Sequence, residues 1–285
     1  MLKSCADIFA LIIAHLANLS FEQGRFPTKF KLAQVLPLLK KSRCGPVSTC
    51  QLQADFKYLS TIVKLIERLV LRLRPHLLSS GNFNPLQSAY RTGHSTETAL
   101  LFVLDNIYKS IDSLQLTTVV CLDISAAFDT ISHSTLLQRL CEEFVVAGMP
   151  SDWLRSYLSN RSYYVKLGSH SSPTVNCTFG VPQGSVLELI LFAAYISPLS
   201  RVISSHGVGH HQYADDTQLF LAMRASTMQA DLLKLEDVKS WFAKNDLLLN
   251  ADKSEAMMIG TSFQLRSAAT FSTVTVANSR LTVSS

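Results

Sequence analysis

Residues 211–222 read His-Gln-Tyr-Ala-Asp-Asp-Thr-Gln-Leu-Phe-Leu-Ala, and two adjacent aspartates, Asp215 and Asp216, stand at the centre of this stretch. Apolar residues flank them, so we expect two strands, His211–Ala214 and Thr217–Ala222, joined as a hairpin with the carboxylates at its tip. Such a hairpin carries its tip to the edge of the core, a poor place for two like charges unless a cation is bound. The alternative is a hydrated surface turn, because aspartates are common turn formers.

A third carboxylate, Asp123, follows the apolar run Val119–Leu122. The segment Thr117–Ile124 is rich in β-branched residues and almost wholly apolar, which is typical of a central strand. After such a strand the Asp123 carboxylate is either solvated, liganded or used as a helix N-cap. Carboxylates brought together from two distant segments can hold two divalent cations ~3.5–4 Å apart, and such a pair activates a 3′-hydroxyl and stabilises a leaving pyrophosphate.

Three further features admit two interpretations each. Phe128, five residues after Asp123, is either a core aromatic or a wall under a sugar ring. The stretch Gly180–Ser185 has a proline and two glycines before a helix, so it is either a turn with a cap or a place where backbone approaches a ligand. Lys253 is either an exposed loop lysine or a cation that neutralises a phosphate or delivers a proton.

Composition bounds the class of protein. The chain has 285 residues, of which 47% are hydrophobic and 16% charged, so it is long and apolar enough to bury a core and is not a disordered chain. The net charge of +5 permits a polyanionic partner without requiring one. Six scattered cysteines form no C-x-x-C pair, which disfavours a zinc site and favours a reduced, intracellular chain.

The first residues resemble a secretory signal, because Lys3 precedes the apolar run Ile8–Ala14. Asp7 and His15 interrupt that pattern, and no clear cleavage site follows. We therefore favour an amphipathic helix, whose apolar face consists of Ile8, Leu11, Ile12, Leu16 and Leu19. No apolar run reaches the ~20 residues of a membrane span, so we expect no membrane partner.

The remaining elements follow from hydrophobic periodicity and turn residues. Helices are predicted over Leu59–Arg74 (ended by Pro75), from Ser95 or Thr96 to Ser110, and over Ser134–Phe144, Ser185–Ile203 and Gln229–Asn245. Further strands are predicted at Ala33–Leu39, at Tyr163–Leu167 and Thr174–Phe179 as a hairpin, and at Leu247–Leu249 and Ala256–Ile259. This order predicts an α+β fold: a split βαβ antiparallel sheet with helices on one face.

Taken together, these stretches resemble the sequence motifs of reverse transcriptases. Residues 120–131 look like motif A, residues 180–187 like motif B, residues 213–217 like motif C and residues 250–255 like motif D. Residues 87–96 are similar to the fingers block of LINE-type, non-LTR retrotransposon enzymes of the jockey-like branch. The motifs occur in the family's order and spacing, and the resemblance covers nearly the whole chain.

The resemblance implies a right-hand polymerase fold with fingers and palm. Residues 1–117 would be a fingers-like region with an N-terminal helix, residues 118–260 the palm, and residues 261–285 a tail that stops before the primer-grip strand. We therefore expect the thumb to be absent. The implied activity is RNA-directed DNA polymerisation, with an RNA template, a DNA primer and deoxynucleoside triphosphates as partners.

The resemblance also implies roles for single residues. Asp123 and Asp215 would hold two Mg²⁺ ions, or Mn²⁺, with support from Asp216. Phe128 would sense the ribose 2′-hydroxyl, and Lys253 would face the leaving pyrophosphate. The implied nucleotide-binding residues are Ile124, Phe128, Gln183, Gly184, Lys253 and Arg91.

Two departures from the family pattern bear on activity. The fingers arginine that normally grips the triphosphate is missing from Asp55–Ser60, and Glu188 stands where motif B usually continues with Gly-Pro. A charge at that point would enter an apolar helix start. The alternatives to a working polymerase are therefore a catalytically inactive nucleic-acid-binding remnant and a remnant that folds poorly.

Overall fold

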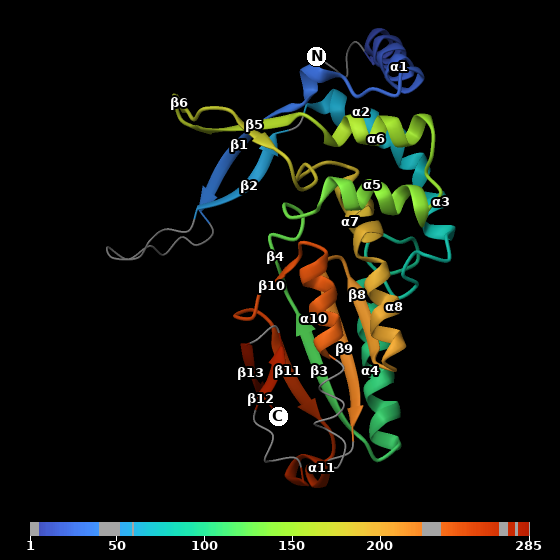
Figure 1. Ribbon diagram of the computed structural model, residues 1–285, viewed down its shortest axis with the longest axis vertical. Helices are drawn as coiled ribbons and strands as arrows, with labels where there is room; N and C mark the ends of the chain where they lie inside the picture. The colour runs from blue at the N-terminus through green and yellow to red at the C-terminus, as the bar shows by residue number, and fades with distance from the viewer. Residues whose placement is uncertain are drawn as a thin grey trace. The chain divides into compact units, whose positions relative to one another are not determined.

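The computed structural model describes residues 6–39, 52–58, 60–223, 235–267, 273–276 and 279–284. The chain forms two compact units, and each is assembled from separate stretches of sequence. Unit 1 combines residues 1–80 with 131–191, and unit 2 combines residues 81–130 with 192–285. Figure 1 traces their elements. The boundaries of these units differ from the boundaries of the expected fingers (residues 1–117), palm (118–260) and tail (261–285). The assignment of those regions stays a prediction.

Unit 1 contains a small mixed sheet. Strand β1 (Leu32–Leu39) pairs antiparallel with β2 (Leu52–Tyr58) and parallel with β5 (Arg161–Leu167). Strand β5 also pairs antiparallel with β6 (His170–Ser171) and β7 (Val175–Cys177). The predicted strand at residues 33–39 and the predicted hairpin over residues 163–179 are therefore confirmed.

The helices of unit 1 are α1 (Ala6–Glu22), α2 (Thr61–Val70), α3 (Arg74–Ser79), α5 (His133–Glu142) and α6 (Met149–Leu158). Helix α2 begins at Thr61 because the side chain of Ser60 accepts a hydrogen bond from the Ile62 N–H. The prediction that Pro75 ends this helix is wrong. Pro75 instead lies in the first turn of α3, where its missing N–H leaves no helical hydrogen bond unmade.

Helix α1 does not bury the apolar face that its periodicity predicts. Ile8, Leu11 and Ile12 are 65%, 75% and 58% exposed. The buried positions are Ala17 and Ser20, and the hydroxyl of Ser20 accepts a hydrogen bond from the indole of Trp153 in α6. Apolar residues occupy almost every side of the first turns of α1, so spacing alone does not decide which side packs. Among the described residues, no helix combines the length and the apolar character that crossing a membrane requires.

Unit 2 is built on a sheet with strand order β12-β13-β11-β3-β9-β8. Strand β3 (Leu116–Leu122) is central and pairs antiparallel with β9 (Asp216–Met223) and β11 (Glu255–Ile259). Strand β8 (Gly209–Tyr213) forms a hairpin with β9. These findings confirm the central strand and the hairpin. Strands β12 (Thr273–Val276) and β13 (Ser279–Ser284) extend the sheet beyond β11 and were not predicted.

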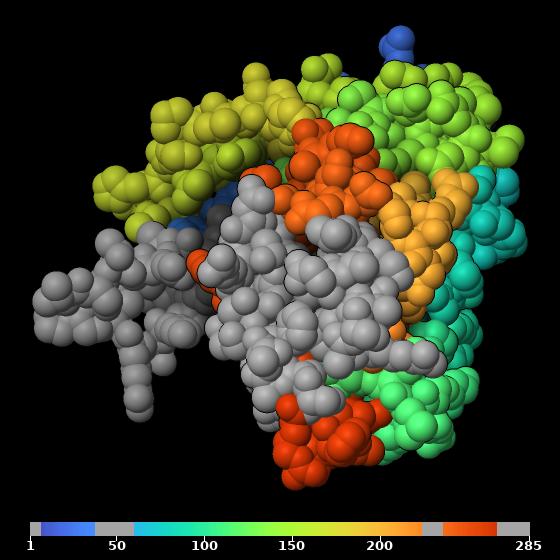
Figure 2. Space-filling view, turned by 60° about the horizontal axis from the view of Figure 1, so that its bottom comes forward, coloured from blue at the N-terminus to red at the C-terminus, as the bar shows by residue number. Residues whose placement is uncertain are grey.

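Helices cover both faces of this sheet, which corrects the expectation of helices on one face. Neighbouring residues of a strand point to opposite faces. In β8, His210 contacts Ser200 of helix α8 (Pro198–Ser205), whereas the ring of His211 lies 5.4 Å from that of Phe102 in helix α4 (Thr96–Asp112). Helix α10 (Leu235–Lys244) packs beside α8, as Figure 2 shows (α10 orange-red, α8 yellow-orange).

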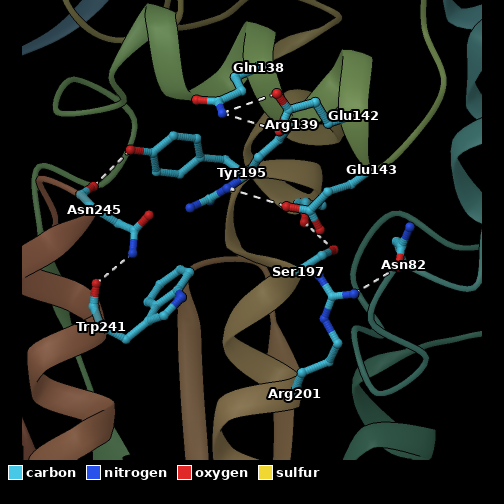
Figure 3. Close-up of polar contacts among 11 residues, drawn as sticks. Asn82, Gln138, Arg139, Glu142, Glu143, Tyr195, Ser197, Arg201, Trp241 and Asn245 are labelled. Carbon is cyan, nitrogen blue, oxygen red and sulfur yellow. Dashed lines mark hydrogen bonds and ion pairs between the residues drawn. The ribbon is translucent and has the colours of Figure 1, made fainter.

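The long helix predicted over residues 185–203 is divided in two. Helix α7 (Glu188–Ile196) ends before Ser197, and α8 starts at Pro198, which has no N–H to continue the helix. The hydroxyl of Tyr195 donates to the Asn245 carbonyl at 2.8 Å, and the Asn245 amide donates to the Trp241 carbonyl (Figure 3). These bonds tie α7 to the C-terminal end of α10.

The capping box of α4 confirms its predicted start, with Ser95 as N-cap and Thr98 as its partner. Helix α10 confirms the predicted helix over residues 235–244, and residues 229–234 of that prediction lie outside the described part. Besides β12 and β13, the elements without a sequence prediction include β2, α3, α6 and α11 (Ser262–Ser267).

Candidate active site

The sheet of unit 2 brings the three aspartates to one end of its central strands. Leu122, the last residue of β3, pairs with Thr217 of β9, and Asp123 and Asp216 are the next residues on each strand. Tyr213 and Asp216 close the β8–β9 hairpin, with Ala214 and Asp215 in its turn. The register therefore places Asp123 beside the hairpin tip, as the sequence predicts.

The carboxylates interact electrostatically. Burial raises the pKa of Asp215 above its ordinary value, and the charge of Asp123 raises it further against the lowering effect of Lys253. Burial also raises the pKa of Asp216, and the charges of Asp215 and Asp123 act in the same direction. Burial is thus the main cause of both shifts, and the mutual repulsion of the three carboxylates adds to it.

A loop from the far end of the chain supplies the compensating cation. The ammonium of Lys253 lies 3.7 Å from Oδ2 of Asp123. The backbone N–H of Asn250 donates to the Asp123 carbonyl (2.9 Å), and the Asp123 N–H donates to the hydroxyl of Ser254 (3.2 Å). Strands β4 (Ile124–Ser125) and β10 (Leu248–Leu249) pair alongside. Lys253 thus reaches Asp123 because its loop is bonded to the backbone around that residue.

The carboxylate oxygens of the three aspartates are chemically suited to bind a divalent cation. Oδ2 of Asp123 is buried and has no hydrogen-bond partner, which is unusual for a carboxylate oxygen. Carboxylate oxygens are the ligands that Mg²⁺ and Mn²⁺ prefer. Within the described ranges, however, no three acidic, histidine or cysteine side chains are already gathered as metal ligands. The residues suit the metal in chemistry and charge, and their side chains are not arranged as a preformed cage.

The glycine-containing loop before α7 belongs to unit 1 and is held by two carboxylates. The N–H of Gly184 donates to Oε2 of Glu188 at 2.6 Å, and the N–H of Val186 donates to Oε2 of Glu67 at 2.7 Å. Gly184 has φ +76°, which glycine adopts without strain. The loop that carries Gln183 and Gly184 is therefore fixed through its own backbone.

Glu188 stands at the start of the apolar helix α7, as expected, and its charge has partners there. Its carboxylate serves the loop, and its own N–H donates to the hydroxyl of Ser185 at 3.0 Å. Ser185 and Glu188 have the spacing of a capping box, but the Glu188 carboxylate accepts the N–H of Gly184, and the N–H of Ser185 donates to the Pro182 carbonyl. The charge stabilises the helix N-terminus because acidic groups are favourable there.

A family model described as reverse transcriptase (RNA-dependent DNA polymerase) matches residues 51–278. The chain belongs to the reverse transcriptase family. It is 27% identical over 256 residues to a probable RNA-directed DNA polymerase from transposon BS, and 25% identical over 252 residues to the RNA-directed DNA polymerase from mobile element jockey, both of Drosophila melanogaster. These matches cover 86% and 85% of this chain but 27% of each relative. The chain thus spans about a quarter of the length of these curated relatives.

Solved structures share the fold of this reverse transcriptase domain. The telomerase of Candida tropicalis in complex with a fragment of telomeric RNA aligns with a TM-score of 0.53 at 13% identity, over 70% of this chain and 34% of that chain. The apo telomerase of the same organism aligns with a TM-score of 0.50 at 14% identity, over 77% of this chain and 44% of that chain. The predicted right-hand polymerase fold is confirmed by these neighbours.

The other predicted nucleotide-binding residues have the following surroundings. The ring of Phe128 is half-buried and lies 4.9 Å from that of Phe192, so it packs against α7. Ile124 is buried opposite Leu249. Arg91 donates to the Pro85 carbonyl at 2.8 Å and so braces its own loop. Their roles toward a nucleotide stay predictions.

Sequence reasoning missed three polar residues that hold this machinery. Ser254 binds the backbone of Asp123, Glu67 binds the loop before α7, and Gln87 binds the backbone of Ala214 at the hairpin tip. Glu67 carried one readable signal, because it lies four residues after Val63 and three before Val70, on their side of the helix. Ser254 and Gln87 lie in stretches that carry the family resemblance, residues 250–255 and 87–96, but their roles were not assigned because their partners are backbone groups far away in sequence.

Proposed function

We propose that this chain is the polymerase domain of a non-LTR retrotransposon protein and adds deoxynucleotides to a primer 3′-end on an RNA template. The observation that carries the proposal is the meeting of Asp123, Asp215 and Asp216 at one end of the unit 2 sheet, with Lys253 beside Asp123. Adjacent carboxylates with raised pKa values and one nearby cation are the electrostatic setting in which divalent ions bind.

In the proposed mechanism, Asp123 and Asp215 would hold two Mg²⁺ or Mn²⁺ ions, with Asp216 in support. Bound there, the metal would supply Lewis-acid activation of the primer hydroxyl and charge stabilisation of the leaving pyrophosphate. The protein's own part is to position these carboxylates on strands whose pairing fixes their spacing. Oδ2 of Asp123 supports this assignment, because it is buried and accepts no hydrogen bond, with the Lys253 ammonium 3.7 Å away as an ionic neighbour.

Lys253 acts as the mobile charge of the site. Its side chain is 58% exposed, so the ammonium can leave Asp123 for an incoming phosphate while it stays accessible to solvent. In this position it compensates the carboxylates before the reaction, then neutralises the pyrophosphate or gives it a proton. Its loop stays in place throughout, because Asn250 and Ser254 are bonded to the backbone of Asp123.

The remaining roles concern the nucleotide. As the resemblance implies, we assign Gln183 and Gly184 of unit 1 to nucleotide binding. In unit 2 we assign Phe128 to the sugar, Ile124 to nucleotide binding and Arg91 to the template or nucleotide. An RNA template, a DNA primer and deoxynucleoside triphosphates are the proposed partners, and the names of the relatives support this choice. We further propose that the chain consists of fingers and palm regions. We also propose an intracellular location, because Cys121, Cys141 and Cys177 are free thiols.

Primer extension tests the proposal. The purified chain is given an RNA template with an annealed DNA primer, the four deoxynucleotides and Mg²⁺, beside the variants Asp215→Ala and Asp105→Ala. Asp105 is an exposed aspartate of α4 that pairs with Lys109, so it controls for the loss of a carboxylate elsewhere. We expect extension by the wild-type chain and by Asp105→Ala, and none by Asp215→Ala. Extension that survives Asp215→Ala would defeat the proposal.

The second candidate function is nucleic-acid binding without turnover. Two observations favour it: the carboxylates are not gathered as a cage, and the usual fingers arginine is missing from residues 55–60. The same assay separates the two functions. Salt-dependent binding of the primed duplex with no extension at any Mg²⁺ or Mn²⁺ concentration selects the second function.

A further inference from the structure

The residue before Asp215 has an unusual backbone conformation. Ala214 has φ +57°, in the left-handed region that residues with a Cβ rarely adopt. Such a conformation persists only when the surroundings fix it. Because Asp215 follows directly, the dihedral angles of Ala214 set the direction in which the Asp215 carboxylate leaves the hairpin.

One side chain binds both backbone groups of Ala214. The amide of Gln87 donates from Nε2 to the Ala214 carbonyl at 2.9 Å, and its Oε1 accepts the Ala214 N–H at 2.9 Å. The same oxygen accepts the N–H of Ala89 at 3.1 Å. Gln87 is fully buried, so water does not compete for these bonds. The amide of Gln87 thereby satisfies both backbone groups of Ala214, as a neighbouring strand would.

Gln87 is itself held in place by backbone pairing. Its segment forms a parallel bridge to β8: the Ser88 N–H donates to the Gln212 carbonyl, and the Gln212 N–H donates to the Leu86 carbonyl, both at 3.0 Å. Arg91 braces the same segment through the carbonyls of Pro85 and Gln87. The amide of Gln87 therefore approaches the hairpin tip from a fixed support.

We infer that Gln87 is a positioning residue of the metal site, which holds Ala214 in its left-handed conformation so that the Asp215 carboxylate faces Asp123. This inference rests on the proposed function, because it assumes that Asp215 binds metal. Gln87 touches no reacting atom and acts only through the backbone of Ala214. Outer groups that orient metal ligands typically change metal affinity by roughly 10- to 100-fold when they are removed.

The test compares Gln87→Met with Ser88→Ala. Methionine is of similar length but cannot make the two amide bonds. Ser88 is the next residue on the same buried segment, and it bonds to His211 rather than to the tip, so its loss controls for general loosening. Two properties are measured on the whole chain: Mn²⁺ binding, from the loss of the free-ion electron paramagnetic resonance signal, and amide hydrogen exchange of peptides that contain Ala214 and Asp215.

We expect Gln87→Met to weaken Mn²⁺ binding roughly 10-fold or more and to speed exchange at the tip, while exchange in β3 stays slow. Ser88→Ala should leave both properties near the wild-type values. Unchanged exchange at the tip, or equal effects of the two variants, would overturn the inference whatever happens to the metal. If the wild-type chain binds no Mn²⁺, the proposed function fails, and the metal part of this inference fails with it.

A second variant guards against misfolding. Gln87→Glu keeps the length of the side chain and an oxygen for the Ala214 N–H, but it removes the donor to the Ala214 carbonyl. If Gln87→Met loses its cooperative unfolding transition, Gln87→Glu is measured in its place. Faster exchange at the tip together with weaker Mn²⁺ binding supports the inference, and wild-type values for both refute it.

Discussion

The hydroxyl of Tyr157 donates to the carboxylate of Glu67 at 2.7 Å, and both side chains are fully buried in unit 1. The second oxygen of Glu67 accepts the backbone N–H of Val186. One acidic group on α2 thus joins helix α6 to the glycine-containing loop before α7. Burial raises the pKa of Glu67, while its hydrogen bonds and the charge of Arg161 act in the opposite direction.

Replacing Glu67 with alanine should be strongly destabilising. The change leaves the Tyr157 hydroxyl and the Val186 N–H buried without partners, at about 1–3 kcal/mol each. We expect the free energy of unfolding, measured with urea, to fall by about 3 kcal/mol, with a smaller loss for Glu67→Gln. Glu142→Ala on the exposed side of α5 is the control and should stay within about 0.5 kcal/mol of wild type. If Glu67→Ala leaves the free energy of unfolding unchanged, the hydrogen bonds of Glu67 contribute nothing to stability.

Glu188 should stabilise the chain rather than disturb it. Because it accepts the Gly184 N–H, Glu188→Ala removes a cap at the start of α7 and should cost about 1 kcal/mol. Glu188→Gln keeps an acceptor and should cost less. Chemical denaturation measures both variants. A gain in stability on replacement by alanine would restore the view that this charge is misplaced.

The sequence predicted the end of the sheet that carries the three aspartates well because its signals are local. A buried strand that ends in Asp123 and a hairpin that carries Asp215 follow from patterns a few residues long, and their pairing follows from the antiparallel order. The resemblance then indicated which unrelated loop, with Lys253, belongs beside them. The structure places that ammonium 3.7 Å from Asp123.

What the sequence did not predict depends on long-range contacts. Periodicity assigned Ile8 and Leu11 to the apolar face of α1. The buried positions are instead Ala17 and Ser20, and Ser20 accepts a hydrogen bond from Trp153. Glu188 was read as a departure from the family pattern, because its partner is a backbone N–H, which no sequence pattern reveals. The support from Gln87 was invisible for the same reason: its bonds go to the backbone of a residue 127 positions away.

Histidine 210 should make unfolding depend on pH. Burial lowers the pKa of His210 to about 4; a hydrogen bond to the backbone of Val208 acts in the opposite direction, and the charge of His211 adds to the lowering. Its ring contacts Ser200 and is 2% exposed. The unfolded chain binds a proton near the ordinary histidine pKa of 6.5, and the folded chain resists it. Stability from this group is therefore complete above that pH and is lost as the pH falls toward 4.

The measurement is the free energy of unfolding at pH 7 and pH 5. We expect His210→Gln to remove about 2 kcal/mol of the loss that the wild-type chain shows between these pH values. His170→Gln, at an exposed position of β6, is the matched control and should keep the wild-type dependence. If His210→Gln and the wild-type chain lose equal stability on acidification, His210 is not the responsible group.

Lys253 should affect metal binding and turnover in opposite directions. Its charge lowers the pKa of Asp215 and lies 3.7 Å from Asp123, so it competes with a cation for the same carboxylates. Removing it in Lys253→Met should tighten Mn²⁺ binding, by only about 2-fold because the side chain is exposed and screened. The same change should slow primer extension, since the leaving pyrophosphate loses its cation. Lys253→Arg, which keeps the charge, should retain wild-type Mn²⁺ affinity. Equal weakening of binding and extension by Lys253→Met would show instead that the lysine only maintains the loop around Ser254.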